Sequence, residues 1–148
     1  MNDRAKQMYE DIELLFNHGD PKEGLLNACY NAISEFPEES SFWYLSSRIL
    51  QALDRPDDAQ KDINLALKFD TFNVQYNLQL FNVLIQQKQT DMIPRRINWL
   101  FDNAPSEVKA EIAKFAEVGI ESGLFSKFDL ANDALVEILK IKNKRENN

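Results

Sequence analysis

Apolar residues recur at intervals of three and four along most of the chain, which is the spacing of one buried face on an α-helix. The first stretch of this kind covers about residues 3–17 and carries one apolar stripe, formed by Tyr9, Ile12, Leu15 and Phe16. Similar stretches follow, separated by turn residues such as Gly19, Pro37 and Pro105. The pattern predicts eight helices in four antiparallel pairs, and the last helix covers about residues 125–141. Residues 142–148 contain no apolar side chain and are expected to fray.

The apolar pattern also repeats at a lag of 34 residues. Several sets of positions at this lag are apolar throughout, among them Phe16, Leu50, Leu84 and Val118, and Cys29, Ile63, Ile97 and Ala131. A fixed period of this size is typical of helical hairpins that stack, because one hairpin cannot bury its apolar face alone. We therefore predict an all-α fold, an α-α superhelix (solenoid) of about four stacked antiparallel hairpins. It forms one domain over residues 1–141, with units at about 6–39, 40–73, 74–107 and 108–141.

The second unit resembles the tetratricopeptide repeat family in residue type as well as in period. Its matching positions are an aromatic residue, a small residue, two packing residues and two alanines: Trp43, Ser47, Leu50, Ile63, Ala59 and Ala66. The other units match in spacing but less well in residue type, and their small position holds Glu13, Phe81 and Phe115. The resemblance implies that the first helix of each unit lines a groove in which a partner protein binds. The family's carboxylate clamp is not implied, because Glu10, Leu14 and Leu45 stand where its basic and amide residues belong.

By the same resemblance, nine residues are expected to line the partner-binding groove: Tyr44, Arg48, Gln51, Gln75, Leu78, Asn82, Ile85, Lys109 and Ile112. Tyr44, Leu78 and Ile112 stand 34 residues apart and would form an apolar track. Arg48 and Asn82 would flank this track as hydrogen-bond donors. An apolar track beside polar donors suits an extended peptide or a helix of another protein. The alternative is that Leu78 and Ile112 are simply core residues.

Composition and charge narrow the classes of partner. The 148 residues carry a net charge of −7, and the isoelectric point is near 4.8. Nucleic acid and anionic membrane surfaces require a basic face, so we expect neither as a main partner. No run of about 18 apolar residues occurs, so no membrane insertion is expected. Cys29 is the only cysteine, so no disulfide can form within the chain and nothing indicates an oxidising compartment. We therefore expect a cytoplasmic location.

Candidates for catalysis and metal binding are few. His18 is the only histidine and lies in a predicted turn, and Cys29 occupies a core position of the repeat. A metal site or a nucleophile–base pair needs several such residues together. Paired acids at helix starts, such as Asp57 and Asp58, offset the helix dipole. The sequence therefore predicts no catalytic residue, no metal and no cofactor.

These observations favour a non-enzymatic interaction module. We expect an adaptor, scaffold or assembly chaperone that holds a peptide or helix of another protein in a groove. One alternative is a structural self-assembly module in which two copies pair as a homodimer. Another is an acidic inhibitor or immunity-type binder, whose negative charge would speed the capture of a basic protein.

Overall fold

The computed structural model describes residues 1–147, which form eight α-helices and a short 3-10 helix, η1, and contain no β-strand. The predicted all-α fold is therefore confirmed. The chain divides into two compact units. The first unit, Met1–Gln87, holds five helices: α1 (Asp3–His18), α2 (Lys22–Glu35), α3 (Ser40–Ala52), α4 (Pro56–Phe69) and α5 (Val74–Gln86). The second begins at Lys88, so the boundary falls between the two helices of the predicted third hairpin.

Local signals in the sequence set the ends of the helices in the first unit. The Asn2 side chain accepts a hydrogen bond from the Ala5 backbone N–H at 2.8 Å and caps α1. Gly19 ends that helix in the left-handed region, with φ of 93°, where glycine carries no steric penalty. Pro56 occupies the first turn of α4, where its missing N–H is not needed. Asn73 caps α5 through the Tyr76 N–H at 3.1 Å.

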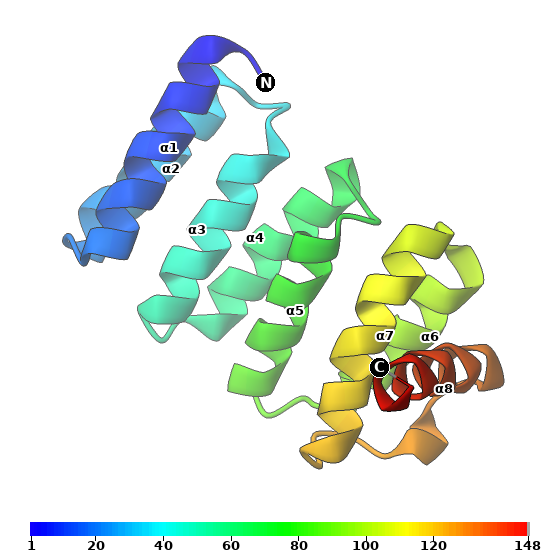
Figure 1. The fold of residues 1–148 in the computed structure, drawn as a ribbon. Helices are drawn as coiled ribbons and strands as arrows, with labels where there is room; N and C mark the ends of the chain where they lie inside the picture. Colours follow the sequence, from blue (N-terminus) through cyan, green and yellow to red (C-terminus); the bar gives the residue numbers. More distant parts are fainter. Residues whose placement is uncertain (148) are drawn as a thin grey trace. The chain divides into compact units, whose positions relative to one another are not determined.

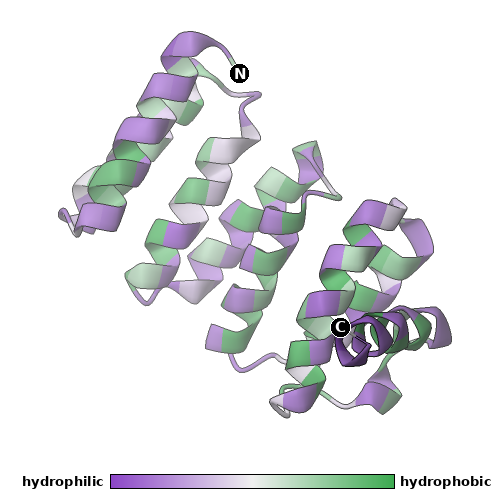
Figure 2. Cartoon of the chain, viewed as in Figure 1, coloured by the Kyte–Doolittle hydropathy of each residue, from purple (hydrophilic) through white to green (hydrophobic). Residues whose placement is uncertain are grey.

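The helices of the first unit pack in succession (Figure 1). Each contacts the next along the chain, and α3 also contacts both α1 and α5. The side chains between them are apolar and fully buried, including Phe42, Leu45, Ile49, Leu50, Ile63 and Phe81. Hydrophobic and hydrophilic residues alternate along the ribbon of α5, as expected for a helix with buried sides (Figure 2).

A buried carboxylate joins three helices of the first unit. Asp62 in α4 is only 7% exposed. Its Oδ2 accepts hydrogen bonds from the Tyr30 hydroxyl in α2 and the Ser46 hydroxyl in α3, each at 2.8 Å. Burial raises the pKa of Asp62 above its ordinary value, although the two hydrogen bonds act in the opposite direction. This network ties α2, α3 and α4 together through one polar group.

The raised pKa of Asp62 predicts how stability depends on pH. Between the unfolded pKa, ordinarily 3.8, and the higher folded pKa, the native state binds more protons than the unfolded state. The contribution of Asp62 to stability is therefore fully present below the unfolded pKa and is lost as the pH rises through the folded pKa. We expect the difference in free energy of unfolding, wild type minus Asp62→Asn, to become smaller as the pH rises through this window. Urea titrations from about pH 3 to 7 measure the difference, and a difference that grows with pH would contradict the assignment.

The second unit contains α6 (Met92–Asn103), α7 (Ser106–Glu121), η1 (Lys127–Asp129) and α8 (Asn132–Glu146). All three α-helices contact one another. The sequence predicted a single last helix over residues 125–141, and its start is wrong. Ser126 forms a capping box with Asp129 that starts η1. The Asn98 side chain in α6 then binds both ends of the connection, donating to the Asp129 carbonyl at 3.0 Å and accepting from the Ala131 N–H at 2.9 Å.

The end of α8 also differs from the prediction. Residues 142–146 were expected to belong to a frayed tail, yet the helix continues through Glu146. Arg145 accounts for this, because its guanidinium reaches back to α7, where it pairs with Glu117 and lies 3.9 Å from the Glu121 carboxylate. Asn148 lies outside the described residues. In the described part of the chain, no helix combines the length and the apolar character that crossing a membrane requires.

Candidate functional site

The structure brings three of the predicted groove residues together on one surface of the first unit. Arg48, Gln51 and Asn82 line a hollow of about 440 Å³. Residues from α1, α3 and α5 complete its lining: Phe16, Ala52, Gln79 and Gln86. We call this site the amide hollow, because four of its seven lining residues are glutamine or asparagine.

Arg48 is held in place from three directions. Its Nη1 donates to the Glu13 carboxylate in α1 at 2.8 Å. The guanidinium carbon lies 5.4 Å from the centre of the Phe16 ring and 5.5 Å from the centre of the Tyr44 ring, within the range of cation–π attraction. Within residues 1–147, Glu13 is the hydrogen-bonding partner found for this side chain. The other guanidinium N–H groups of Arg48 are therefore available to a ligand in a fixed orientation.

The amides of the hollow also form a fixed network. Gln79, only 5% exposed, donates from Nε2 to Gln51 Oε1 at 3.0 Å and to Ser47 Oγ at 3.2 Å. Gln86 Nε2 donates to the Gln51 backbone carbonyl at 3.0 Å and to Asp54 Oδ1 at 3.3 Å. These bonds decide which way each amide points, because the reverse orientation would place acceptors against acceptors.

Two groups in the hollow have no protein partner among the described residues. Gln86 Oε1 is buried and accepts no hydrogen bond there. Asn82 is exposed on α5, and no side-chain hydrogen bond to it is found within residues 1–147. An unpaired buried acceptor costs free energy until a donor arrives. Asn82 therefore offers both an acceptor and a donor to an incoming polar chain, whereas a ligand reaches Gln86 Oε1 only if that side chain moves.

The remaining predicted residues in the first unit lie outside the lining of the hollow. Tyr44 is half-buried and stacks on Tyr76, with ring centres 5.1 Å apart and planes at 27°. Leu78 is half-buried, while Gln75 and Ile85 are exposed on α5. Tyr44 thus lies against Arg48 and Tyr76 and does not line the amide hollow.

Two predicted groove residues belong to the second unit. Lys109 is half-buried on α7. Ile112 is fully buried, and this corrects the expectation that it offers apolar surface to a partner. The physical reason is that α7 has both α6 and α8 as neighbours, so the side of the helix that carries Ile112 is covered. The alternative interpretation of Ile112 as a core residue is the one that the structure favours.

Four lining residues were not predicted as site residues. Phe16 was interpreted as a core position of the 34-residue repeat, yet it lies half-buried at the hollow. Gln79 and Gln86 are two of the five amide side chains on α5, and this number of amides on a largely buried helix was the signal that could have identified them. Ala52 carries no chemical signal of its own.

The sequence offered Cys29 and His18 as the only residues of their kind for catalysis. Cys29 is fully buried in the core, and burial raises the pKa of its thiol to about 12, so little thiolate is present near neutral pH. The exposed His18 ring lies 2.9 Å from the Asp20 carboxylate. Among residues 1–147, no three His, Cys, Asp or Glu side chains gather as a metal-ion site requires.

No family model matches the chain, and no curated protein sequence matches it. Function is therefore inferred from the chemistry of the amide hollow. Glutamine and asparagine side chains carry one carbonyl and two N–H donors each, as a backbone peptide group carries one carbonyl and one N–H. Such side chains can bond a polypeptide backbone without regard to its sequence. The ring of Phe16 adds one apolar contact at the edge of the hollow.

Proposed function

We propose that this protein is a non-enzymatic interaction module, similar to the tetratricopeptide repeat proteins, that binds an extended segment of a partner protein in the amide hollow. The observation that carries this proposal is the convergence of Arg48, Gln51, Gln79, Asn82 and Gln86 from two adjacent helices on one open surface. An extended peptide presents carbonyls and N–H groups along one edge, and these match the acceptors and donors of the hollow.

The arrangement of helices in the first unit supports a repeat architecture. The contacts α1–α2, α2–α3, α3–α4 and α4–α5, together with α1–α3 and α3–α5, are those expected of hairpins that stack on one another. In such a stack the first helix of each hairpin lines the binding surface, and α1, α3 and α5 are the first helices of the predicted units. The solenoid of hairpins is part of this proposal, and the resemblance at Trp43, Ser47 and Ala59 supports it.

The side chains of the amide hollow are restricted before any ligand binds, and this supports the proposal that the hollow is a binding site. Exposed arginine and glutamine side chains lose considerable rotamer freedom on binding. Here the ion pair to Glu13 and the two flanking rings restrict Arg48 before any ligand arrives. Hydrogen bonds restrict Gln79 and Gln86 in the same way. Less entropy is lost on binding, so each contact contributes more to affinity.

The proposal predicts the behaviour of peptides selected from a random library displayed on phage. We expect the immobilised chain to select peptides whose affinity falls when the hollow is altered. Arg48→Ala removes a charge-assisted donor and should weaken binding by about 10–100-fold. Asn82→Ala removes one neutral amide and should weaken binding by about 3–10-fold. Fluorescence polarisation with labelled peptide measures both dissociation constants.

The matched control for the loss of charge is Lys68→Ala, an exposed residue on α4 outside the hollow. It should bind the same peptides as tightly as the wild type. Far-ultraviolet circular dichroism of each variant should remain that of the wild type, since both Arg48 and Asn82 can be truncated without opening the core. If selected peptides bind the Arg48→Ala and Asn82→Ala variants as tightly as they bind the wild type, the amide hollow is not the binding site.

A further inference from the structure

The most exposed large apolar side chain among the described residues is Phe128, which is 86% exposed. It lies in η1, in the second unit, and the neighbouring Lys127 ammonium lies 5.4 Å from the centre of its ring. Val136 and Leu139 on α8 are also exposed, at 49% and 57%. A phenyl ring in water at this degree of exposure is a strong candidate for an interface contact.

The turn that carries Phe128 is held by several hydrogen bonds. Ser126 Oγ accepts from the Phe128 N–H at 3.2 Å, and the Asp129 carboxylate accepts from the Ser126 N–H at 3.3 Å. Asn98 binds the segment immediately after it. The Phe125 ring packs directly on Gly119 in α7, where even a Cβ atom would lie 2.5 Å from it. Phe128 is therefore presented on a turn whose shape is set before binding.

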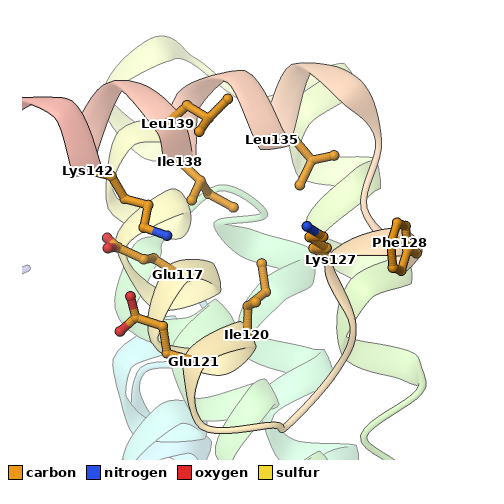
Figure 3. Close-up of a pocket in the computed structure, with 9 residues that line it drawn as sticks. All are labelled: Glu117, Ile120, Glu121, Lys127, Phe128, Leu135, Ile138, Leu139 and Lys142. Carbon is orange, nitrogen blue, oxygen red and sulfur yellow. The ribbon is translucent and has the colours of Figure 1, made fainter.

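An apolar pocket of about 320 Å³ lies beside Phe128, between α7 and α8. Ile120 projects into it from α7, and Leu135 and Ile138 project into it from α8 (Figure 3). Lys127 and Phe128 stand at one end of the pocket, and Glu117, Glu121 and Lys142 stand at the other (Figure 3). A cavity of about 150 Å³ can hold benzene, so this pocket has room for a phenyl ring.

The charges at the two ends of the pocket differ. Arg145 engages Glu117, which is almost fully buried, and lies farther from Glu121, whose side chain is 54% exposed. Lys127, also exposed, has no ion pair among the described residues. One end of the pocket therefore presents a cation beside the phenyl ring. The other presents the half-exposed Glu121 carboxylate, with Lys142 at the same end and Arg145 at 3.9 Å.

We propose that two copies of this chain associate through this surface about a two-fold axis, with Phe128 of each copy inserted in the α7–α8 pocket of the other. A two-fold interface uses the same surface on both copies, so that surface must be complementary to itself. This one carries a protruding ring and a pocket that accepts a ring. It also carries a lysine at one end and a glutamate at the other, so that Lys127 of each copy meets Glu121 of its partner.

Sedimentation velocity of the full chain at concentrations up to about 1 mM tests the proposal, because small interfaces give weak dimers. We expect a reversible monomer–dimer equilibrium. Phe128→Ala should raise the dissociation constant by at least about 30-fold, the effect of losing a hot-spot residue. The matched control is Phe69→Ala on α4, which is 55% exposed and should leave the equilibrium unchanged. A wild type that stays monomeric over this concentration range overturns the proposal. The pocket would then serve another protein or a small apolar molecule.

Charge reversal tests the orientation of the two copies. In Glu121→Lys the new lysine faces Lys127 of the other copy, and in Lys127→Glu the new glutamate faces Glu121 of the other copy. Each variant alone should therefore dimerise less than the wild type. Mixing the two variants should restore the dimer as a heterodimer, because every lysine then meets a glutamate. A mixture that does not dimerise better than either variant alone overturns the two-fold arrangement. Peptide binding at the amide hollow should survive Phe128→Ala, so failure of one proposal is distinguishable from failure of the other.

Discussion

Replacing Phe42 with alanine is expected to lower the free energy of unfolding of the first unit by about 3–5 kcal/mol, the range for truncating a fully buried phenylalanine. Phe42 lies in α3 and is 0% exposed. Its ring centre is 6.1 Å from that of Tyr9 in α1 and 6.5 Å from that of Phe36, which precedes α3. Truncation would leave a cavity where the first hairpin packs on the second. Urea unfolding followed by the fluorescence of Trp43, with Trp99 replaced by phenylalanine in every variant compared, measures the loss.

The control for Phe42→Ala is again Phe69→Ala, which removes the same side chain from a position that is 55% exposed. Its cost should be below about 1 kcal/mol, because little apolar surface is returned to water and no cavity forms. Equal losses for the two variants would mean that the first hairpin is not stabilised by packing on the second. The result bears on function as well, since α1 supplies Glu13 and Phe16 to the surroundings of Arg48.

The apolar pattern was enough to predict the helices, because each buries a face with the helical period. The prediction of α1 over residues 3–17 differs from the structure by a single residue. Local pattern was not enough at residues 125–131. There the backbone is directed by the Asn98 side chain, which comes from α6 and binds the backbone of Asp129 and Ala131. Contacts between residues this far apart leave no trace in local periodicity.

The position of a residue in the 34-residue repeat was enough to predict part of the candidate site. Counting from Trp43 placed Arg48, Gln51 and Asn82 on one surface of their helices, and these three line the amide hollow. The same counting placed Ile112 there, although it is buried. A repeat period indicates which residues share a face of a helix. Whether that face is exposed or buried depends on which helices pack against it. For α7 those neighbours include α8, whose start the sequence did not reveal.

The amides of the hollow depend on a small residue behind them. Ser47 in α3 is fully buried, and its hydroxyl donates to the Ala59 carbonyl in α4 at 2.8 Å. The same oxygen accepts from Gln79 Nε2 at 3.2 Å. A hydroxyl this close to a backbone carbonyl shows that α3 and α4 approach closely at this point. Ser47 therefore links the packing of one hairpin to the orientation of a glutamine in the hollow.

Ser47→Leu is expected to lower the free energy of unfolding of the first unit by about 3 kcal/mol, because overpacking and the loss of a buried hydrogen bond act together. The larger side chain has no room against the Ala59 backbone, so α3 and α4 must separate. Urea unfolding with Trp43 fluorescence again measures the change.

Ser47→Ala separates the two roles of this residue. It keeps the helices close and removes only the hydroxyl, so its cost should be about 1 kcal/mol. It also deprives Gln79 of one of its two acceptors, so that Gln51 alone holds this amide. The weaker restraint should reduce peptide affinity at the hollow by about 3-fold or more. If Ser47→Leu proves as mild as Ser47→Ala, then close approach of α3 and α4 is not what requires a small residue. If Ser47→Ala leaves peptide affinity unchanged, the order of the amide network does not contribute to binding.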